Sequence, residues 1–463
     1  MPVILLILFF FILVMLIIMT YHIRVVLKKN EASDHEQEKT NRVQAWIYAV
    51  IVLTIVAIIT SIYFVVKGTP WEAHLMEWLN IVVRVMHITF GIAWIGASFY
   101  FVFLENALNR TENIRDELAG NLWAVHGGGF YYLEKYKVAP KTIPKHLHWF
   151  KYEAYFTWLS GIGLLFIVYY FNASAMLIDP VVMKLTTAEG IAIGIGSFIA
   201  AWCMYDLLCK SPLRKKPILF ATIGTLVLIA FAWFYSQVFS GRAAFIHFGA
   251  MIGSIMVANV FFVIIPAQKA MVNAAKRGQL PDAQKGKNAL FRSIHNNYFT
   301  LPVIFVMVSN HFPGTFSHAY QWIVLAAISL GSAGIKHWLN LREQGQFSVW
   351  VMPVSVLVLL AVVFATAPKA STTKCNEISF ATANAIIQQR CVSCHSSMPT
   401  DDVYKTAPNG VKYDTPQEIV AKKELILQRV VLTKTMPQNN KTNMTPEERD
   451  AIRCWIEQGA TVK

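Results

Sequence analysis

A short motif near the C-terminus of the 463-residue chain carries the most specific chemistry in the sequence. Cys391 and Cys394 are separated by two residues, and His395 follows directly. Thiols at this spacing add across the vinyl groups of one haem, and the adjacent imidazole then ligates the iron. A redox-active thiol pair or half of a zinc site is the alternative, but no second C-x-x-C and no H-x-x-x-H follows. We therefore predict a covalently attached c-type haem.

The iron of such a haem usually takes Met or His as its second axial ligand. No histidine follows His395, so the candidates are Met398, Met436 and Met444. Met398 is too close to His395 in the chain to reach the opposite face of the haem. Met436 lies further on, in the sequence Lys-Thr-Met-Pro, and we predict that it is the ligand.

The other two cysteines of the tail are Cys375 and Cys454. The oxidising compartment in which c-type haem is attached permits a disulfide between them, and the sequence leaves this pairing open. The stretch from Thr445 to Gln458 opens with a Thr-Pro-Glu-Glu capping pattern and is predicted to form a terminal helix.

Two histidines in apolar segments, His87 and His247, have similar surroundings, with an arginine shortly before and small residues after each. Ionisable side chains inside a membrane are usually functional, and small residues let a flat cofactor approach closely. The functional interpretation is that both imidazoles ligate one b-type haem near the outer face. The alternative is two buried, hydrogen-bonded histidines.

Polar and aromatic residues gather in three segments on the opposite side: His126-Gly-Gly-Gly129, His148-Trp-Phe-Lys-Tyr-Glu153 and His295-Asn-Asn297. Successive glycines bring backbone amides close to an anion or a flat ring. Indole, ammonium, carboxylate and amide groups together can stack on and hydrogen-bond a polar heteroaromatic ligand. The alternative is an interfacial aromatic belt with a snorkelling lysine.

The elements that position these residues are predicted to be membrane helices. Apolar residues make up 55% of the chain and charged residues 15%, and the mean hydropathy is +0.44. A soluble domain carries about 25% charged residues, so a soluble enzyme, a disordered chain and a disulfide-dense secreted module are excluded. Apolar runs that can cross a core roughly 30 Å thick predict spans at 3–20, 45–66, 79–104, 153–171, 188–208, 217–238, 243–265, 297–310, 320–335 and 347–366.

Lys and Arg are distributed unevenly between the loops that join these spans. Alternate loops hold 24 of them on one side and 3 on the other. Because cytoplasmic loops carry such an excess, the richer side is predicted to be cytoplasmic and both termini to lie outside. The net charge of +14 is therefore a topological signal, and we predict no nucleic-acid partner.

The predicted fold is all-α: a polytopic transmembrane bundle of nine or ten spans with a C-terminal extracytoplasmic domain that resembles a small cytochrome c. The predicted parts are an N-terminal anchor span and loop at 1–44, an integral-membrane domain at 45–366, a linker at 367–374 and the cytochrome c domain at 375–463. A cytochrome tethered to a membrane domain implies electron transfer.

Three runs of the membrane domain resemble those of a known family. They extend from His87 to Phe101, from His148 to Gly161 and from His295 to Val303. Their sequences are similar to those of the bacterial membrane-bound urate oxidases, also called cytochrome-c-linked urate hydroxylases. That family joins an integral-membrane domain to a C-terminal cytochrome c.

The resemblance implies that urate is oxidised to 5-hydroxyisourate with water as the oxygen source. Two electrons would leave through the tail to the respiratory chain, with a terminal oxidase or a soluble cytochrome c as acceptor. Together with the loop charges, the resemblance implies a multi-pass protein of the bacterial inner membrane, surrounded by lipid, with the cytochrome c domain on the periplasmic side.

Urate is largely a monoanion at working pH, so Lys151 or the glycine amides are expected to bind it and a nearby base to accept a proton. The predicted catalytic residues are His148, Lys151, Glu153 and His295. The predicted substrate-binding residues are Gly127, Gly128, Trp149, Asn296 and Asn297.

Electrons from a cytoplasmic urate site must cross about 30 Å of low-dielectric core. One or two b-type haems are therefore expected, with inner ligands from His126, His148, His295 or His337. Urate binding from outside would need only one. Two other functions stay open: a haem-b dehydrogenase for quinol or a porphyrin precursor, and a non-enzymatic electron-transfer module.

Overall fold

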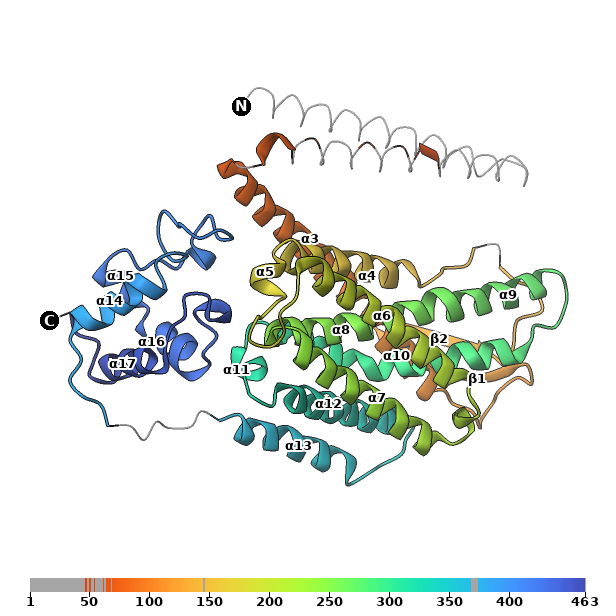
Figure 1. Cartoon of the computed structure of the whole chain (residues 1–463). Coiled ribbons are helices and arrows are strands. Elements are labelled where there is room, and N and C mark those ends of the chain that lie inside the picture. Colours follow the sequence, from red (N-terminus) through yellow and green to blue (C-terminus); the bar gives the residue numbers. More distant parts are fainter. Residues whose placement is uncertain are drawn as a thin grey trace. The chain divides into compact units, whose positions relative to one another are not determined.

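The structure is a computed structural model, drawn in Figure 1. It describes residues 46–47, 50, 54, 61, 64–67, 69–144, 146–367 and 374–462. The predicted span at 3–20, most of the span at 45–66 and the centre of the predicted linker lie outside the described residues. The chain divides into two compact units, Met1–Leu75 and Met76–Lys463. The second unit carries every candidate site residue.

Eight helical segments coincide with the eight spans predicted from residue 79 onward. Five of them are long and apolar enough to cross a membrane, which is consistent with a membrane protein. The eight are α3 (Pro70–Asn106), α4 (Tyr152–Leu164) with the π-helical η1 (Leu165–Tyr170), α6 (Thr187–Lys210), α7 (Pro217–Val238), α8 (Gly241–Ala258) continuing through the π-helical η3 (Asn259–Ile264) into α9 (Ile265–Lys276), α10 (Ala283–Ser309), α12 (Gln321–Glu343) and α13 (Val351–Ala365). Short turns of helix join them: α5 (Ala173–Met176), η2 (Pro212–Lys215) and α11 (Pro313–Phe316).

Local sequence determines where these helices begin. The hydroxyl of Thr186 accepts a hydrogen bond from the backbone N–H of Glu189, whose carboxylate accepts one from the N–H of Thr186. This reciprocal cap satisfies N–H groups that a helix start leaves unpaired. Pro217 occupies the first turn of α7, where a missing N–H costs nothing. Both helices therefore begin within one residue of the predicted spans.

The core of the membrane domain is centred on α8, which packs against α4, α6, α7 and α10. Phe245, Phe248 and Met251 of α8 are completely enclosed. Gly249 lets α8 approach α10 closely, because a Cβ at this position would lie 2.5 Å from Cγ1 of Val306. The side chains of α8 are therefore held rigidly among four neighbouring helices.

A β-hairpin corrects the all-α prediction. β1 (Leu118–His126) pairs antiparallel with β2 (Gly129–Tyr136) in the loop between α3 and α4. Gly127 and Gly128 form its two-residue turn, with φ of 58° and 79°. A type I′ turn needs positive φ at both positions, which glycine adopts without steric cost. The hairpin was missed because the glycines were interpreted as a ligand-binding loop.

Three helices extend further than predicted on the side of the basic loops. The α8–α9 helix continues to Lys276 rather than 265, α10 begins at Ala283 rather than 297, and α12 continues to Glu343 rather than 335. The sequence predicts loops there because Lys and Arg interrupt the apolar pattern. The structure instead places Arg292 and Lys336 inside helices, with both side chains buried.

The tail has a small helical core of its own. Its helices are α14 (Phe380–Arg390), α15 (Pro416–Ala421), α16 (Lys423–Ile426) continuing into the π-helical η5 (Leu427–Leu432), and α17 (Pro446–Glu457), with the short 3-10 turns η4 (Pro408–Gly410) and η6 (Gln438–Asn440). Ile387, Ile419, Ile452 and Trp455 pack together at its centre. Thr445 and Glu448 form the capping box of α17, so the predicted terminal helix is confirmed.

Cys375 and Cys454 form a disulfide, with their Cα atoms 5.2 Å apart and a sequence separation of 79. We expect Cys375→Ser to lower the free energy of unfolding of the tail by about 2–5 kcal/mol, because the unfolded chain regains the entropy of an open loop. Hydrogen exchange of the α14 and α17 peptides in the full-length protein measures this loss. Cys203→Ser, which removes an exposed thiol from α6, is the control. Equal protection of the tail in both variants would contradict the prediction.

An ion pair joins α14 to α17. Arg390 Nη2 lies 2.9 Å from Glu448 Oε1, and Arg390 Nε lies 3.1 Å from both carboxylate oxygens. The hydrogen bonds from Arg390 lower the pKa of Glu448, against the opposing effect of burial. The stabilisation is therefore fully present above the ordinary Glu pKa and is lost as the pH falls through the lowered pKa of the folded state.

We expect Glu448→Gln to destabilise the tail by about 1–2 kcal/mol at neutral pH, because the charged hydrogen bonds are lost while Gln still caps the helix. The difference from the wild type should shrink as the pH falls below 4.5, the ordinary pKa of this group. Hydrogen exchange of α17 across this pH range is the measurement. Glu377→Gln changes an exposed carboxylate of the tail that lies outside its helices and should leave the stability unchanged. A pH-independent loss in Glu448→Gln would exclude the ion pair as its cause.

Candidate functional site

A buried ion pair between α6 and α10 forms the centre of a polar cluster. Arg292 is 4% exposed, and its Nη2 lies 2.6 Å from Oδ1 of Asp206. The other carboxylate oxygen of Asp206 lies 2.6 Å from Nζ of the exposed Lys210. The guanidinium also stacks over the ring of Tyr205, at 4.9 Å. Charged groups inside a helical membrane domain are costly, so they are retained where they pair or serve a function.

Amide and hydroxyl groups extend this cluster toward His295. The side-chain amide of Asn259 donates to Oδ1 of Asn296 at 2.8 Å and to the hydroxyl of Tyr205 at 3.1 Å. The Tyr205 hydroxyl lies 2.8 Å from Nδ1 of His295, and the direction of this hydrogen bond depends on the tautomer of the imidazole. When Nδ1 accepts from the hydroxyl, the ring carries its proton at Nε2; when Nδ1 donates, Nε2 is free to accept a proton, the role predicted from the sequence.

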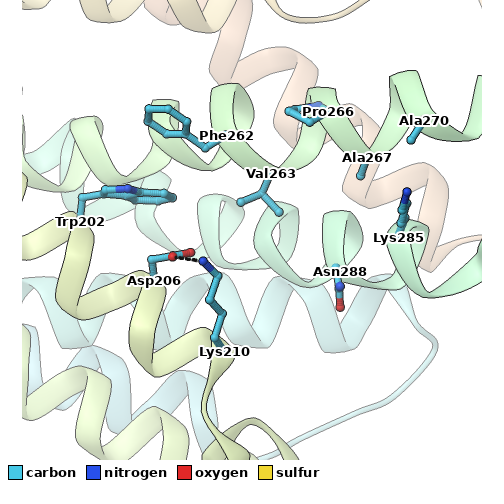
Figure 2. A pocket seen from close by; sticks show the side chains of 10 residues that line it. All are labelled: Trp202, Asp206, Lys210, Phe262, Val263, Pro266, Ala267, Ala270, Lys285 and Asn288. Atoms are coloured by element: carbon cyan, nitrogen blue, oxygen red, sulfur yellow. Dashed lines mark ion pairs between the residues drawn. The ribbon is translucent and has the colours of Figure 1, made fainter.

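A cavity of about 540 Å³ lies beside the ion pair, between α6, η3, α9 and the start of α10. Figure 2 shows Asp206 and Lys210 joined by their ion pair at one side of it and Lys285 at another. Trp202 and Phe262 line it with stacked rings whose centroids lie 5.8 Å apart. An aromatic wall with lysines at the rim suits the approach of a planar anion.

A second polar group lies where α10 meets α12. Asn340 Nδ2 donates to Oδ1 of Asn297 at 3.1 Å. Among the residues that the structure describes, the remaining donor, Asn297 Nδ2, and the remaining acceptor, Asn340 Oδ1, have no hydrogen-bond partner, although both atoms are buried. Buried polar groups in proteins are almost always paired. These two atoms therefore require a further group.

Lys336 lies one turn before Asn340 on the same face of α12. Its side chain is 2% exposed, and its Nζ lies 4.2 Å from the ring centre of Phe99 on α3. Within the described part of the chain, no carboxylate lies within 4 Å of this ammonium. The acid further along α12, Glu343, instead accepts a hydrogen bond from Asn106.

The predicted site residues at the start of α4 each contact different neighbouring side chains. His148 is exposed and contacts the ring of Phe150, while Lys151 lies over the ring of Tyr152. Trp149 packs with Val260 and Ile265 of the α8–α9 helix. Oε2 of Glu153 is buried without a partner among the described residues. No described contact joins this segment to His295, Asn296 or Asn297, so the structure does not assemble the predicted residues into one site.

Gly127 and Gly128, predicted to bind substrate, lie at the exposed tip of the β-hairpin. A Cβ added at either glycine would meet nothing within 4 Å. Their positive φ values alone account for glycine at both positions. The structure supplies this conformational reason, and their role in binding stays a prediction.

His87 contacts the middle of α4. Its Nδ1 lies 3.0 Å from the carbonyl oxygen of Thr157 and 3.2 Å from Oγ of Ser160. Its ring also lies against Gly161, where a Cβ would come within 2.9 Å of the imidazole. The half-buried imidazole is therefore held against α4.

His247 is fully buried, and each of its two ring nitrogens has a hydrogen-bond partner within the protein. Nδ1 hydrogen-bonds to the carbonyl of Ala243 at 2.8 Å, and Nε2 lies 3.2 Å from the hydroxyl of Tyr170. Ser160, beside His87, and Tyr170 are separated by a rise of up to roughly 15 Å along the α4–η1 helix. Both ring nitrogens of His247 thus have partners within the protein, and the haem predicted between His87 and His247 stays a prediction. Aromatic rings enclose His247: Tyr169, Tyr170, Phe198, Tyr235 and Phe239.

The tail presents a donor set that fits a c-type haem. Cys391 and Cys394 are free thiols three positions apart, directly after α14. Nδ1 of His395 donates to the carbonyl of Val411 at 2.9 Å, which leaves Nε2 for the iron. Burial lowers the pKa of His395, against the effect of this hydrogen bond, and so favours the neutral imidazole that binds metal.

The methionines of the tail differ in burial. Met398 is 82% exposed and Met444 is enclosed in the core, 3% exposed. Met436 is half-buried and packs against the same core as Cys391. This placement favours Met436 as the second axial ligand.

Several residues of the polar clusters were missed by the sequence analysis. Each lies on a helix far in sequence from its partner, so no local motif marked it. The sequence places Lys336 at the start of a predicted basic loop. Its position directly after an apolar run that contains Gly331 and Gly334 also suits the interior of a helix. The missed residues are Tyr205, Asp206, Asn259, Arg292, Lys336 and Asn340.

Five helices that are long and apolar enough to cross a membrane, together with a buried polar cluster, are consistent with a membrane protein. The family model described as urate oxidase N-terminal matches residues 73–367, from α3 to α13. The chain therefore belongs to this urate-oxidase-related family, which makes it a urate-related oxidoreductase. No curated protein and no solved structure matches the chain.

Proposed function

We propose that the chain is a membrane-bound urate dehydrogenase that converts urate to 5-hydroxyisourate and delivers the electrons to a c-type haem in its own tail. One observation carries the proposal. The urate oxidase match covers residues 73–367, most of the predicted membrane domain, and the same chain continues into a tail that carries Cys391, Cys394 and His395 at the spacing of a haem-attachment motif.

The proposed reaction balances without oxygen gas. Water forms a bond to C5 of urate, and two protons and two electrons leave. A bound c-type haem accepts one electron at a time, and a terminal oxidase or soluble cytochrome c would then remove each electron. We propose the bacterial inner membrane as the location, with the tail on the periplasmic side. No step is assigned to a membrane haem, because Nε2 of His247 lies against the hydroxyl of Tyr170.

The protein's own residues bind the substrate and handle protons in this proposal. His295, with Nδ1 held by Tyr205, would take up a proton as the electrons leave, away from the segment that contains Glu153. Glu153, whose Oε2 is buried and unpartnered among the described residues, accepts a proton from the substrate or the attacking water. Trp149, Lys151 and His148 would line the approach to Glu153, and Asn296 would hold Asn259 in place.

A visible spectrum of the oxidised protein, taken anaerobically before and after urate, tests the proposal. Urate should produce the bands of a reduced c-type haem, and hypoxanthine, which lacks the 2- and 8-oxo groups, should not. Labelled water should then place its oxygen in the product. Protein that dithionite reduces fully but urate does not reduce would overturn the proposal in favour of a quinol or porphyrin-precursor dehydrogenase.

A further inference from the structure

The α10–α12 boundary holds a set of buried polar groups that the protein itself leaves incomplete. Asn297 is 0% exposed, Asn340 5% and Lys336 2%. One hydrogen bond joins the two amides, which leaves one donor and one acceptor free among the described residues. Each buried polar atom that lacks a hydrogen-bond partner lowers the free energy of unfolding if only protein surrounds it.

The cation in this group has no ion-pair partner among the described residues, and the acid whose charge acts on it, Glu343, accepts a hydrogen bond from Asn106 instead. Lys336 Nζ has only the ring of Phe99 at 4.2 Å, and no carboxylate in the described residues lies within 4 Å of it. An isolated ammonium is expensive to bury, and a cation–π contact offsets only part of this cost. An anion at this position would supply the missing charge.

The pattern of unmet groups specifies the shape of that anion. Two side-chain amides that are already joined by one hydrogen bond, with a donor left on one and an acceptor left on the other, can pair with a lactam edge, in which a carbonyl oxygen adjoins a ring N–H. A lysine on the same face and the ring of Phe99 next to it suit a flat, negatively charged ring. A lone water satisfies one donor and one acceptor but leaves the ammonium without a counter-charge.

We infer that Lys336, Asn297 and Asn340 form the subsite that binds the urate monoanion, Lys336 balancing its charge and the two amides pairing with a lactam edge. This inference rests on the proposed function. It moves the centre of the substrate site from the segment before α4 to the boundary between α10 and α12. Tyr298 and His337, hydrogen-bonded at 2.7 Å beside this group, would form its exposed rim.

Equilibrium dialysis of radiolabelled urate against dithionite-reduced protein tests the subsite, because reduced protein cannot turn urate over. Lys336→Met should weaken binding by roughly 10- to 100-fold, the loss expected for a charge-assisted contact. Asn340→Asp keeps the shape of the side chain but supplies Lys336 with an internal partner, and it should weaken urate binding at least as much. Arg342→Met removes an exposed cation from the same helix and should leave urate binding unchanged.

Urate binding by the two variants, together with the visible spectrum, distinguishes failure of the subsite from failure of the proposed function. Lys336→Met is assessed only if it elutes as a single species on gel filtration, and Asn340→Asp provides the readout otherwise. Dissociation constants within twofold of the wild type in both variants would overturn the subsite, while urate-dependent haem reduction in the wild type would still support the proposed function. Urate binding that depends on Lys336 without any haem reduction would support the subsite and overturn the proposed dehydrogenase.

Discussion

Cys391→Ser is expected to abolish urate oxidation with any acceptor that draws electrons from the tail. The substitution removes one of the two thiols that would hold the haem, so the haem is lost or held by one bond. Activity should fall by more than the roughly 10- to 100-fold that losing an outer hydrogen-bond partner costs a metal site. Anaerobic stopped-flow absorbance with urate and a soluble cytochrome c measures the rate.

The matched control is Cys203→Ser, which changes an exposed thiol of the membrane domain and should keep the full rate. Urate binding to dithionite-reduced Cys391→Ser should also be preserved, because its proposed subsite lies in the membrane domain. A variant that lacks covalent haem but oxidises urate at the wild-type rate would show that the tail is not the obligatory electron exit.

Asp206→Asn is expected to destabilise the membrane domain by about 3–5 kcal/mol, the cost of leaving a buried charge without its partner. Arg292 would retain only its hydrogen bond to Asn259, at 3.3 Å, and its stacking on aromatic rings. Arg292→Met should cost less, because Asp206 is still paired with Lys210. The side chain of Arg292 is 5% exposed and that of Asp206 17%. An unpaired Arg292 is therefore further from water than an unpaired Asp206, so Asp206→Asn should cost more.

A double-mutant cycle decides whether the ion pair itself is the cause. The double variant Asp206→Asn/Arg292→Met should be more stable than the single Asp206→Asn, because it no longer buries an unpaired cation. Unfolding by SDS in mixed micelles gives the free energies. Additive losses would show that the two side chains act independently of each other.

Much of the helical framework was predictable because its signals are local. α7 begins at Pro217 and ends at Val238, as the apolar run predicts, and the Thr186 capping box marks the start of α6. The terminal helix of the tail is confirmed for the same reason. Each of these boundaries depends on residues within one turn of the chain.

The polar clusters were less predictable because they depend on pairing between distant helices. From the sequence, Arg292 belongs to a predicted basic loop. Only the packing of α6 against α10 brings Asp206 next to it. Asn297 was named from its motif, but its partner Asn340 lies on α12, where the sequence predicted a basic loop. The hairpin was missed because one glycine run satisfies both a tight turn and a binding loop, and only the pairing of Leu122 with Leu133 distinguishes them.

The disulfide of the tail has a consequence for what proteolysis can release. It connects Cys375, close to the start of the tail, to Cys454 in α17. The haem-attachment motif and Met436 both lie between these cysteines, inside one covalently closed ring. A single cut anywhere in that ring leaves the two fragments joined. A protease that cuts once within this ring, in an oxidising compartment, would therefore nick the tail without shedding the segment proposed to receive the electrons.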